Sequence, residues 1–425
     1  MENKSGEGKK ATLRIFVLFF HGQSYILVII WVSNLNIRRY ALKDSTEMGV
    51  NMEHYLGESI PKLGFGLMRL PKEESGKIDI EQTKKMVDSF MDAGLNYFDT
   101  AYVYDGGESE RAAKAALVER YPRESYFLAT KMCAWMSASD EKLAKQQFET
   151  SLERTGAGYF DFYLLHALQE DNYKKYEEYG LWDFVKKQKE KGLIKHWGFS
   201  FHASPEILDE ILTAHPDAEF VQLQINYADW ENPDVAARAN YEVARKHGKP
   251  VIIMEPVKGG ALAQPPASVR KIFDETDSGA SYASWAIRYA ASLDGIITVL
   301  SGMSDMGQMI DNLSYMKDFE PLNAEEKKVI RKAQEALEGI PSIPCTSCHY
   351  CTAGCPKHIP IPEIFAARNK QLVWEKIEEG KNSYAQATGK AGMASQCIAC
   401  GQCEKACPQQ IHVIEWLKEC AAAFE

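Results

Sequence analysis

The chain has 425 residues, of which 45% are hydrophobic and 25% are charged, and this is the composition of a soluble globular protein with more than one domain. Its 49 basic and 59 acidic residues give a formal net charge of −10 without a basic stripe, which excludes an ordinary nucleic-acid partner. Clustered cysteines without a secretory signal indicate a reducing compartment, so we expect a cytoplasmic protein.

Residues 1–51 form an N-terminal extension with a hydrophobic stretch from Ile15 to Val32. Roughly 20 apolar residues span a bilayer, but His21 to Ser24 interrupt this stretch, and a small-residue cleavage site is missing. We favour the interpretation that the start codon was assigned too far upstream and that translation begins at Met52. The alternative is a membrane anchor, and contact with a membrane is expected only in that case.

From Met52 onward, short apolar runs alternate with amphipathic helical patterns, and we assign residues 52–339 to one domain. The expected strands are Leu63–Met68, Asn96–Thr100, Tyr126–Lys131, Phe160–His166, Ile194–Phe201, Phe220–Tyr227, Pro250–Pro256 and Gly295–Gly302. Repeated strand–helix units of this number predict an α/β fold, a (β/α)8 TIM barrel. A doubly wound sheet is the alternative, but it would need a G-x-G-x-x-G turn after the first strand, which this sequence lacks.

Reactive side chains lie where the expected strands end, and barrel enzymes carry their chemistry at that face. Asp99 and Tyr104 follow the second strand, Lys131 ends the third, and His166 ends the fourth. We expect Asp99 to pair with Lys131 and hold it charged. The ammonium would lower the pKa of Tyr104 and make it a usable acid and base, while His166 would donate to a substrate oxygen.

These residues resemble the catalytic tetrad of the aldo-keto reductases in order and spacing. The resemblance covers about Met52 to Leu337 and includes Asp99-Thr100-Ala101-x-x-Tyr104, Thr130-Lys131 and Tyr163-Leu164-Leu165-His166. It implies that an aldehyde or ketone is reduced, or the alcohol oxidised, by hydride transfer from NADH or NADPH, with Tyr104 protonating the oxygen. His166 is followed by Ala167-Leu168 where many members have tryptophan and proline, so we expect a different pocket wall.

The same resemblance implies an extended nicotinamide dinucleotide site. Ser200 and Gln222 would hold the carboxamide, and Met254 would lie against the nicotinamide ring. Members that prefer NADPH carry a lysine and an arginine for the 2′-phosphate where this chain has Gly302 and Gln308, so use of NADH is credible. The full set of expected cofactor-binding residues is Gly66, Leu67, Met68, Ser200, Gln222, Met254, Glu255, Pro256, Val257, Gly259, Gly302, Met303, Gln308, Asp311 and Asn312.

Residues 340–425 form the second expected domain, which contains two cysteine runs of identical spacing, C-x2-C-x2-C-x3-C-P. This run holds pairs of 4Fe–4S clusters in bacterial ferredoxins, where the fourth cysteine ligates the other cluster. Structural zinc is the alternative, although its cysteines usually come as separated pairs. The pattern therefore assigns Cys345, Cys348, Cys351 and Cys407 to one cluster, and Cys397, Cys400, Cys403 and Cys355 to the other.

The long separation of the two runs, with helical patterns at Ile361–Lys376 and after Ile411, predicts a helix-rich, ferredoxin-like domain. The two remaining cysteines, Cys133 and Cys420, are expected to be inert buried thiols. A barrel followed by such a domain resembles a subgroup of aldo-keto reductases from anaerobic organisms, in which the clusters either lie near the substrate or are simply appended.

Three functional classes remain open at this point. The first is a carbonyl reductase whose clusters transfer electrons to or from a redox protein partner, such as a ferredoxin. The second is a carbonyl reductase with structural clusters, and the third is a nicotinamide-binding subunit with little turnover. Hydride carries two electrons whereas a cluster takes one at a time, and no flavin motif is evident that would mediate between them.

Overall fold

The computed structural model describes the strands at 12–20 and 23–31, and residues 53–425 except 137, 234, 277, 278, 374 and 375. Residues Met1–Gly49 and Val50–Glu425 form two separate compact units. In the first unit, β1 (Thr12–Phe20) and β2 (Gln23–Trp31) pair as an antiparallel hairpin. Within the described part of the chain, no helix combines the length and the apolar character that a membrane span requires.

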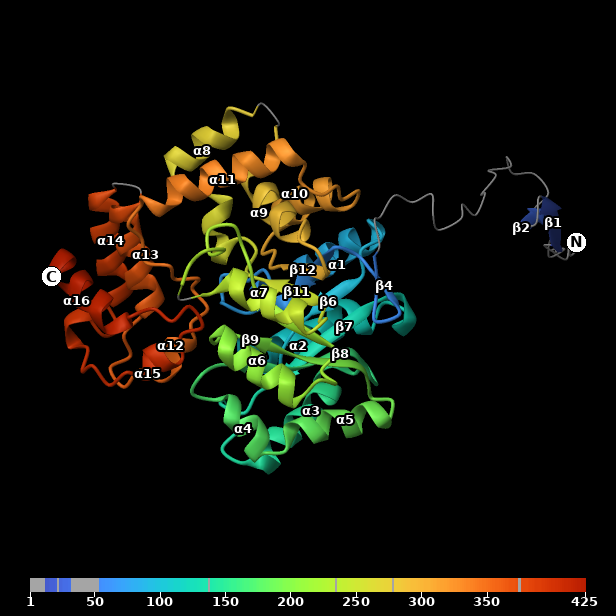
Figure 1. Ribbon diagram of the computed structural model, residues 1–425, viewed down its shortest axis with the longest axis horizontal. Coiled ribbons are helices and arrows are strands. Elements are labelled where there is room, and N and C mark those ends of the chain that lie inside the picture. Colours follow the sequence, from blue (N-terminus) through green and yellow to red (C-terminus); the bar gives the residue numbers. More distant parts are fainter. Residues whose placement is uncertain are drawn as a thin grey trace, which may run out of the picture. The chain divides into compact units, whose positions relative to one another are not determined.

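The second unit is built around a closed barrel of eight parallel strands, as predicted (Figure 1). Each expected run contains a strand, and most strands are shorter than the run, whereas the fourth strand continues two residues beyond it to Leu168. The strands are β5 (Leu63–Gly66), β6 (Tyr97–Asp99), β7 (Phe127–Met132), β8 (Phe160–Leu168), β9 (Ile194–Phe201), β10 (Phe220–Gln224), β11 (Val251–Met254) and β12 (Ile296–Ser301).

Helices follow the strands and surround the barrel, which is the arrangement that buries both faces of a parallel sheet. Their ends carry the signals visible in the sequence: Ser204 precedes Pro205 at the start of α6, and Gly156 ends α3 with a left-handed φ of 64°. The helices of the barrel domain are α1 (Ile80–Asp92), α2 (Glu108–Ala113), α3 (Glu141–Thr155), α4 (Tyr173–Glu178), α5 (Leu181–Glu190), α6 (Pro205–Ala214), α7 (Ala237–Lys246), α8 (Ala267–Asp274), α9 (Tyr282–Ala291), α10 (Met306–Met316) and α11 (Ala324–Glu338).

A hairpin closes the amino-terminal end of the barrel. It consists of β3 (Glu53–Tyr55) and β4 (Glu58–Ile60), and Ile60 is fully buried against inward-facing side chains of the strands. The opposite, carboxyl end of the barrel is therefore the end at which side chains from different strands can form an open site.

The C-terminal domain is helical, as the sequence predicts, and has its own apolar core. Its helices are α12 (Tyr350–Ala353), α13 (Ile361–Leu372), α14 (Ile377–Thr388), α15 (Gln402–Lys405) and α16 (Val413–Phe424), coloured from orange to red in Figure 1. The two short helices, α12 and α15, each follow the second cysteine of one run and pack against each other.

Because Met1–Gly49 is a compact unit of its own, removing residues 1–51 should leave the second unit intact. We expect a chain that begins at Met52 to unfold at the same temperature as the full chain, as measured by circular dichroism, and to bind a nicotinamide dinucleotide with the same affinity. A loss of several degrees in Tm, or weaker dinucleotide binding, would contradict the separation of the two units.

Candidate active site

The four expected tetrad residues lie together at the carboxyl end of the barrel. Lys131 on β7 is fully buried and donates hydrogen bonds to Asp99 Oδ1 at 2.5 Å and to the Thr100 carbonyl oxygen at 2.7 Å. Its ammonium also lies 3.4 Å from the hydroxyl oxygen of Tyr104, to which it donates. A buried lysine needs such partners because an unpaired ammonium in the interior is costly.

The expectation that the pKa of Tyr104 is lowered was wrong. Burial raises the pKa of Tyr104 well above its ordinary value, and the nearby Tyr350 and the carboxylates of Asp99 and Glu255 raise it further. Burial also lowers the pKa of Lys131, which Asp99 opposes through its charge and hydrogen bond. Tyr104 is therefore a neutral phenol around pH 7, which suits a proton donor.

His166 is held at its position by a bulge in β8. The strand register shifts between Leu165 and Leu168, and Ala167 adopts a left-handed φ of 53°. The Ala167 N–H donates to the Ser200 hydroxyl at 2.7 Å, and Trp135 Nε1 donates to the His166 carbonyl oxygen at 3.1 Å. Burial lowers the pKa of His166 well below its ordinary value, so the imidazole is neutral near pH 7.

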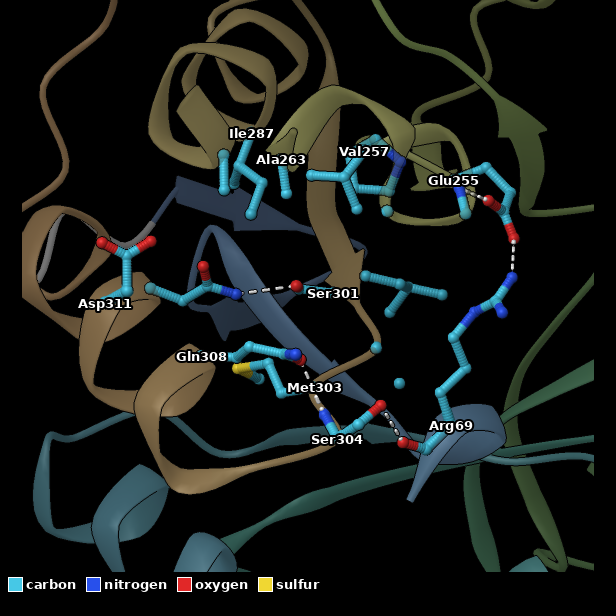
Figure 2. Close-up of a pocket in the computed structure, with 18 of the residues that line it drawn as sticks. Arg69, Glu255, Val257, Ala263, Ile287, Ser301, Met303, Ser304, Gln308 and Asp311 are labelled. Carbon is cyan, nitrogen blue, oxygen red and sulfur yellow. Dashed lines mark hydrogen bonds and ion pairs between the residues drawn. The ribbon is translucent and has the colours of Figure 1, made fainter. Parts of the chain in front are cut away.

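A groove of about 830 Å³ leads away from Tyr104 and Asp99 across the barrel mouth. Thirteen of the fifteen expected cofactor-binding residues line it; the exceptions are Leu67 and Ser200, which are buried beside it. Figure 2 shows the groove between the loop after β11, with Glu255 and Val257, and the start of α10, with Gln308 and Asp311. The groove thus brings together residues from strands far apart in the sequence.

Arg69 is a groove residue that the sequence patterns did not predict. Its guanidinium donates to Glu255 Oε1 at 3.2 Å and to the Thr346 carbonyl oxygen at 2.8 Å (Figure 2 shows the first contact). Glu255 Oε2 in turn accepts the Gly259 N–H at 2.6 Å, so the loop after β11 is tied to η1 (Leu67–Arg69). The sequence signal that could have identified Arg69 is its position directly after Gly66–Met68, which were expected to bind the cofactor.

The end of the groove beside α10 is polar and acidic. Asp311 accepts a hydrogen bond from the Ser281 hydroxyl at 2.8 Å, and Asp274 also lines this pocket. The Gln308 side chain accepts the Ser304 N–H at 2.8 Å, so its carbonyl oxygen is already used within the protein. Gly302 lies under the Arg69 side chain, with Arg69 Cδ 3.4 Å from the position of a Cβ.

The groove fits a nicotinamide dinucleotide in two respects. Its length reaches from the tetrad to the start of α10, and the buried Gln222 side chain leaves its Oε1 without a hydrogen-bond partner beside Met254. An amide N–H₂ group of a ligand would satisfy that oxygen, whereas leaving it buried and unpaired costs free energy.

The first cluster's four expected ligands surround one cavity. Cys345, Cys348, Cys351 and Cys407 line it, together with apolar side chains from α13 and from the segment after Cys407. Burial raises the pKa of Cys348 to about 12, and the charges of Cys407 and Cys345 raise it further. Cysteines from both runs around one hollow are the arrangement that a 4Fe–4S cluster requires.

The second expected set of cluster ligands is more exposed to solvent than the first set. Cys400 is exposed to solvent, whereas Cys403 is buried and its thiol is influenced by Cys397. A Cβ on Gly354 would lie 3.1 Å from the Gln402 side chain, so the chain beside Cys355 runs against the chain beside Cys403. In the described residues, no three His, Cys, Asp or Glu side chains lie close enough together to hold a single metal ion, an arrangement tighter than the one around a four-iron cluster.

The two cysteines outside the runs are buried, as expected for inert thiols. Burial raises the pKa of Cys133 to about 11 and that of Cys420 to about 12. At neutral pH both are therefore protonated and poor nucleophiles.

Comparison with known proteins gives matches for both domains. A model described as the aldo/keto reductase family matches residues 62–335, and a 4Fe-4S dicluster domain model matches residues 344–412. The chain is 23% identical over 284 residues to the uncharacterized oxidoreductase YqkF of Bacillus subtilis, covering 60% of this chain and 86% of YqkF. An aldo-keto reductase of Mycolicibacterium smegmatis is 30% identical over 156 residues, which are 37% of this chain and 51% of that protein.

Solved structures show the same barrel. An aldo/keto reductase from Klebsiella pneumoniae, in complex with NADP and acetate, has a TM-score of 0.54 and 18% identity, covering 68% of this chain and 95% of that one. A holo aldo-keto reductase from Bacillus halodurans has a TM-score of 0.51 and 22% identity, covering 65% and 93%. These likenesses show the fold, and the family model spans more than half of the sequence. The chain belongs to the aldo/keto reductase family and carries a 4Fe–4S dicluster domain after its barrel.

Proposed function

We propose that this protein is a nicotinamide-dependent carbonyl reductase whose two 4Fe–4S clusters exchange electrons with a redox protein. The observation that carries the proposal is the buried Asp99–Lys131–Tyr104 arrangement at one end of a groove long enough for a dinucleotide. The same arrangement argues against a binding subunit without turnover, since mere binding would not require a buried ammonium beside a phenol.

The tetrad residues have separate roles in the proposed reaction. A bound nicotinamide dinucleotide would supply the hydride. The Tyr104 hydroxyl donates its proton to the carbonyl oxygen, and the Lys131 ammonium, 3.4 Å away, stabilises the phenolate that remains. Asp99 keeps Lys131 positioned, and the neutral His166 imidazole orients the carbonyl oxygen through a hydrogen bond.

Two features of the C-terminal domain support electron exchange. The cavity of the first cysteine set lies in the domain that contacts the barrel mouth through Thr346. Around the second set, residues 391–403 carry no charged side chain, and Ile398 and Met393 are 57% and 37% exposed. An uncharged surface beside the exposed Cys400 suits a partner protein that docks over the cluster expected on the second cysteine set, called the outer cluster below.

A structural role for both clusters is the competing proposal, because hydride chemistry needs no one-electron carrier.

The tetrad assignment is tested by Tyr104→Phe. Removing the hydroxyl eliminates general acid catalysis, so carbonyl reduction should fall by roughly 100-fold or more, with nicotinamide affinity unchanged. Steady-state kinetics with a panel of aldehydes and dinucleotide fluorescence titrations measure the two effects. Tyr102→Phe is the matched control, because the Tyr102 ring stacks on the Arg154 guanidinium at 4.3 Å and does not line the groove. Full activity in Tyr104→Phe would remove this residue from the mechanism.

Metal analysis tests the cluster assignment. Protein purified without oxygen should hold about eight irons and as much acid-labile sulfide, as two 4Fe–4S clusters require. Zinc in place of iron would exclude the ferredoxin-like interpretation.

The Cys400→Ser variant should lose roughly half of that iron, since each run supplies ligands to a separate cluster. We expect reduction of a one-electron dye by NADH to fall, while NADH-dependent carbonyl reduction remains, because the tetrad lies in the barrel. If dye reduction is unchanged in a variant that has lost the outer cluster, the clusters have a structural role.

Cofactor preference follows from the charges at the α10 end of the groove. Gly302 and Gln308 offer no cation, and Asp274 and Asp311 disfavour a 2′-phosphate, so NADH should bind at least as tightly as NADPH. Introducing a guanidinium by Gln308→Arg should improve NADPH binding relative to NADH. Ile310→Arg, at an exposed position of the same helix, controls for a general charge effect. A strong NADPH preference in the unaltered protein would mean that other cations hold the 2′-phosphate.

A further inference from the structure

The C-terminal domain contacts the barrel mouth. The inference drawn below from these contacts rests on the proposed carbonyl reductase activity. Gln224 at the end of β10 and Gln409, two residues after Cys407, are both buried, and their side-chain amides donate to each other at 2.7 Å. Thr346, beside Cys345, is also buried, and a Cβ on Gly259 would come within 2.7 Å of its carbonyl oxygen. Both cysteine runs are thus anchored on loops that border the active site.

Tyr350 is the residue of this domain that approaches the tetrad. It lies between Cys348 and Cys351, and its ring centroid is 5.4 Å from that of Trp135, at an interplanar angle of 66°. Trp135 contacts His166 at 6.2 Å between ring centroids, and the His166 ring lies 5.6 Å from that of Tyr104. Tyr350 is also, after burial, the largest influence that raises the pKa of Tyr104, which agrees with a position beside the catalytic hydroxyl.

We propose that Tyr350 is a specificity-determining residue that contacts the substrate, and that the substrate is a flat, neutral aldehyde or ketone, aromatic or conjugated. The rings of Tyr104, His166, Trp135 and Tyr350 contact one another in that order, and a planar group bound beside Tyr104 would meet aromatic edges and faces along this series. The cations at this end of the groove are already paired, Lys131 with Asp99 and Arg69 with Glu255. A substrate carboxylate or phosphate would therefore lack a free cationic partner there.

This position also puts the substrate beside the first cluster. Tyr350 is flanked in sequence by Cys348 and Cys351, two expected ligands that line the first cysteine cavity. A planar molecule that packs on Tyr350 should therefore alter the surroundings of the cluster held by Cys345, Cys348, Cys351 and Cys407. Binding can then be followed without turnover.

The experiment compares Tyr350→Ala and Tyr350→Phe in the full, iron-loaded protein, with benzaldehyde as the aromatic probe and acetaldehyde as the small one. Loss of an aromatic contact should raise the KM for benzaldehyde in Tyr350→Ala by roughly tenfold, with little change for acetaldehyde or in the Kd for the nicotinamide dinucleotide. Tyr350→Phe keeps the ring and should retain the low KM. Where Tyr350→Ala holds less iron than the unaltered protein, Tyr350→Leu, which keeps bulk without aromaticity, takes its place.

Tyr384→Phe is the control, because Tyr384 is a buried tyrosine of the same domain that hydrogen bonds to Glu425. An equal rise of KM in this variant, or an unchanged KM in both Tyr350→Ala and Tyr350→Leu, would overturn the proposal. Electron paramagnetic resonance of the reduced clusters gives a second readout: benzyl alcohol should perturb the spectrum of the unaltered protein and not that of Tyr350→Ala. If benzyl alcohol perturbs the spectrum but no carbonyl is reduced, the reductase proposal fails while the Tyr350 contact stands.

Discussion

A lysine without solvent contact must be paired, and the mouth of this barrel is arranged around that requirement. Lys131 reaches Asp99 on the neighbouring strand and the Thr100 carbonyl oxygen, and Tyr104 lies within reach of the same ammonium. Taking one partner away would leave a buried charge uncompensated, which typically costs about 3–5 kcal/mol. The pairing of β6 with β7 therefore has to be correct for both stability and chemistry.

Burial raises the pKa of Tyr104 and lowers the pKa of His166. The low-dielectric surroundings disfavour the phenolate of Tyr104 and the imidazolium of His166, so both groups are neutral near pH 7. A neutral phenol can give up a proton, and a neutral imidazole can donate one hydrogen bond without competing as an acid. In the proposed reaction, the Lys131 ammonium would stabilise the phenolate that forms when Tyr104 gives up its proton.

The C-terminal domain contacts the barrel mouth and does not simply follow the barrel in sequence. Its contacts with the barrel involve a carbonyl oxygen at Thr346, a side-chain amide at Gln409 and a ring at Tyr350, each beside a cysteine run. Arg69 joins this domain to the loop that carries Glu255 and Gly259. The groove and the first cysteine cavity therefore lie next to each other, because Arg69 lines the groove and Thr346, which it contacts, lines the cavity.

Sequence patterns predicted the features that depend on residues close together in the sequence. Strand–helix alternation indicated the eight strands, cysteine spacing indicated the four residues around one cavity, and strand ends indicated the tetrad. Residues that depend on distant partners were missed: Arg69 contacts Thr346 across the chain, and Trp135 contacts Tyr350. The predicted direction of the Tyr104 pKa shift was wrong because burial has the largest effect on this phenol, and spacing along the sequence does not show how deeply a side chain is buried. The bulge at Ala167 carries no sequence signal, since alanine rarely adopts a left-handed conformation.

The cavity lined by Cys345, Cys348, Cys351 and Cys407 needs residues from both cysteine runs. Although the two runs have identical spacing, the first run contributes three cysteines to this cavity and the second run contributes the fourth. During synthesis the second run must leave the ribosome before Cys407 can join the three cysteines of the first run, so this cavity forms only after both runs have been made.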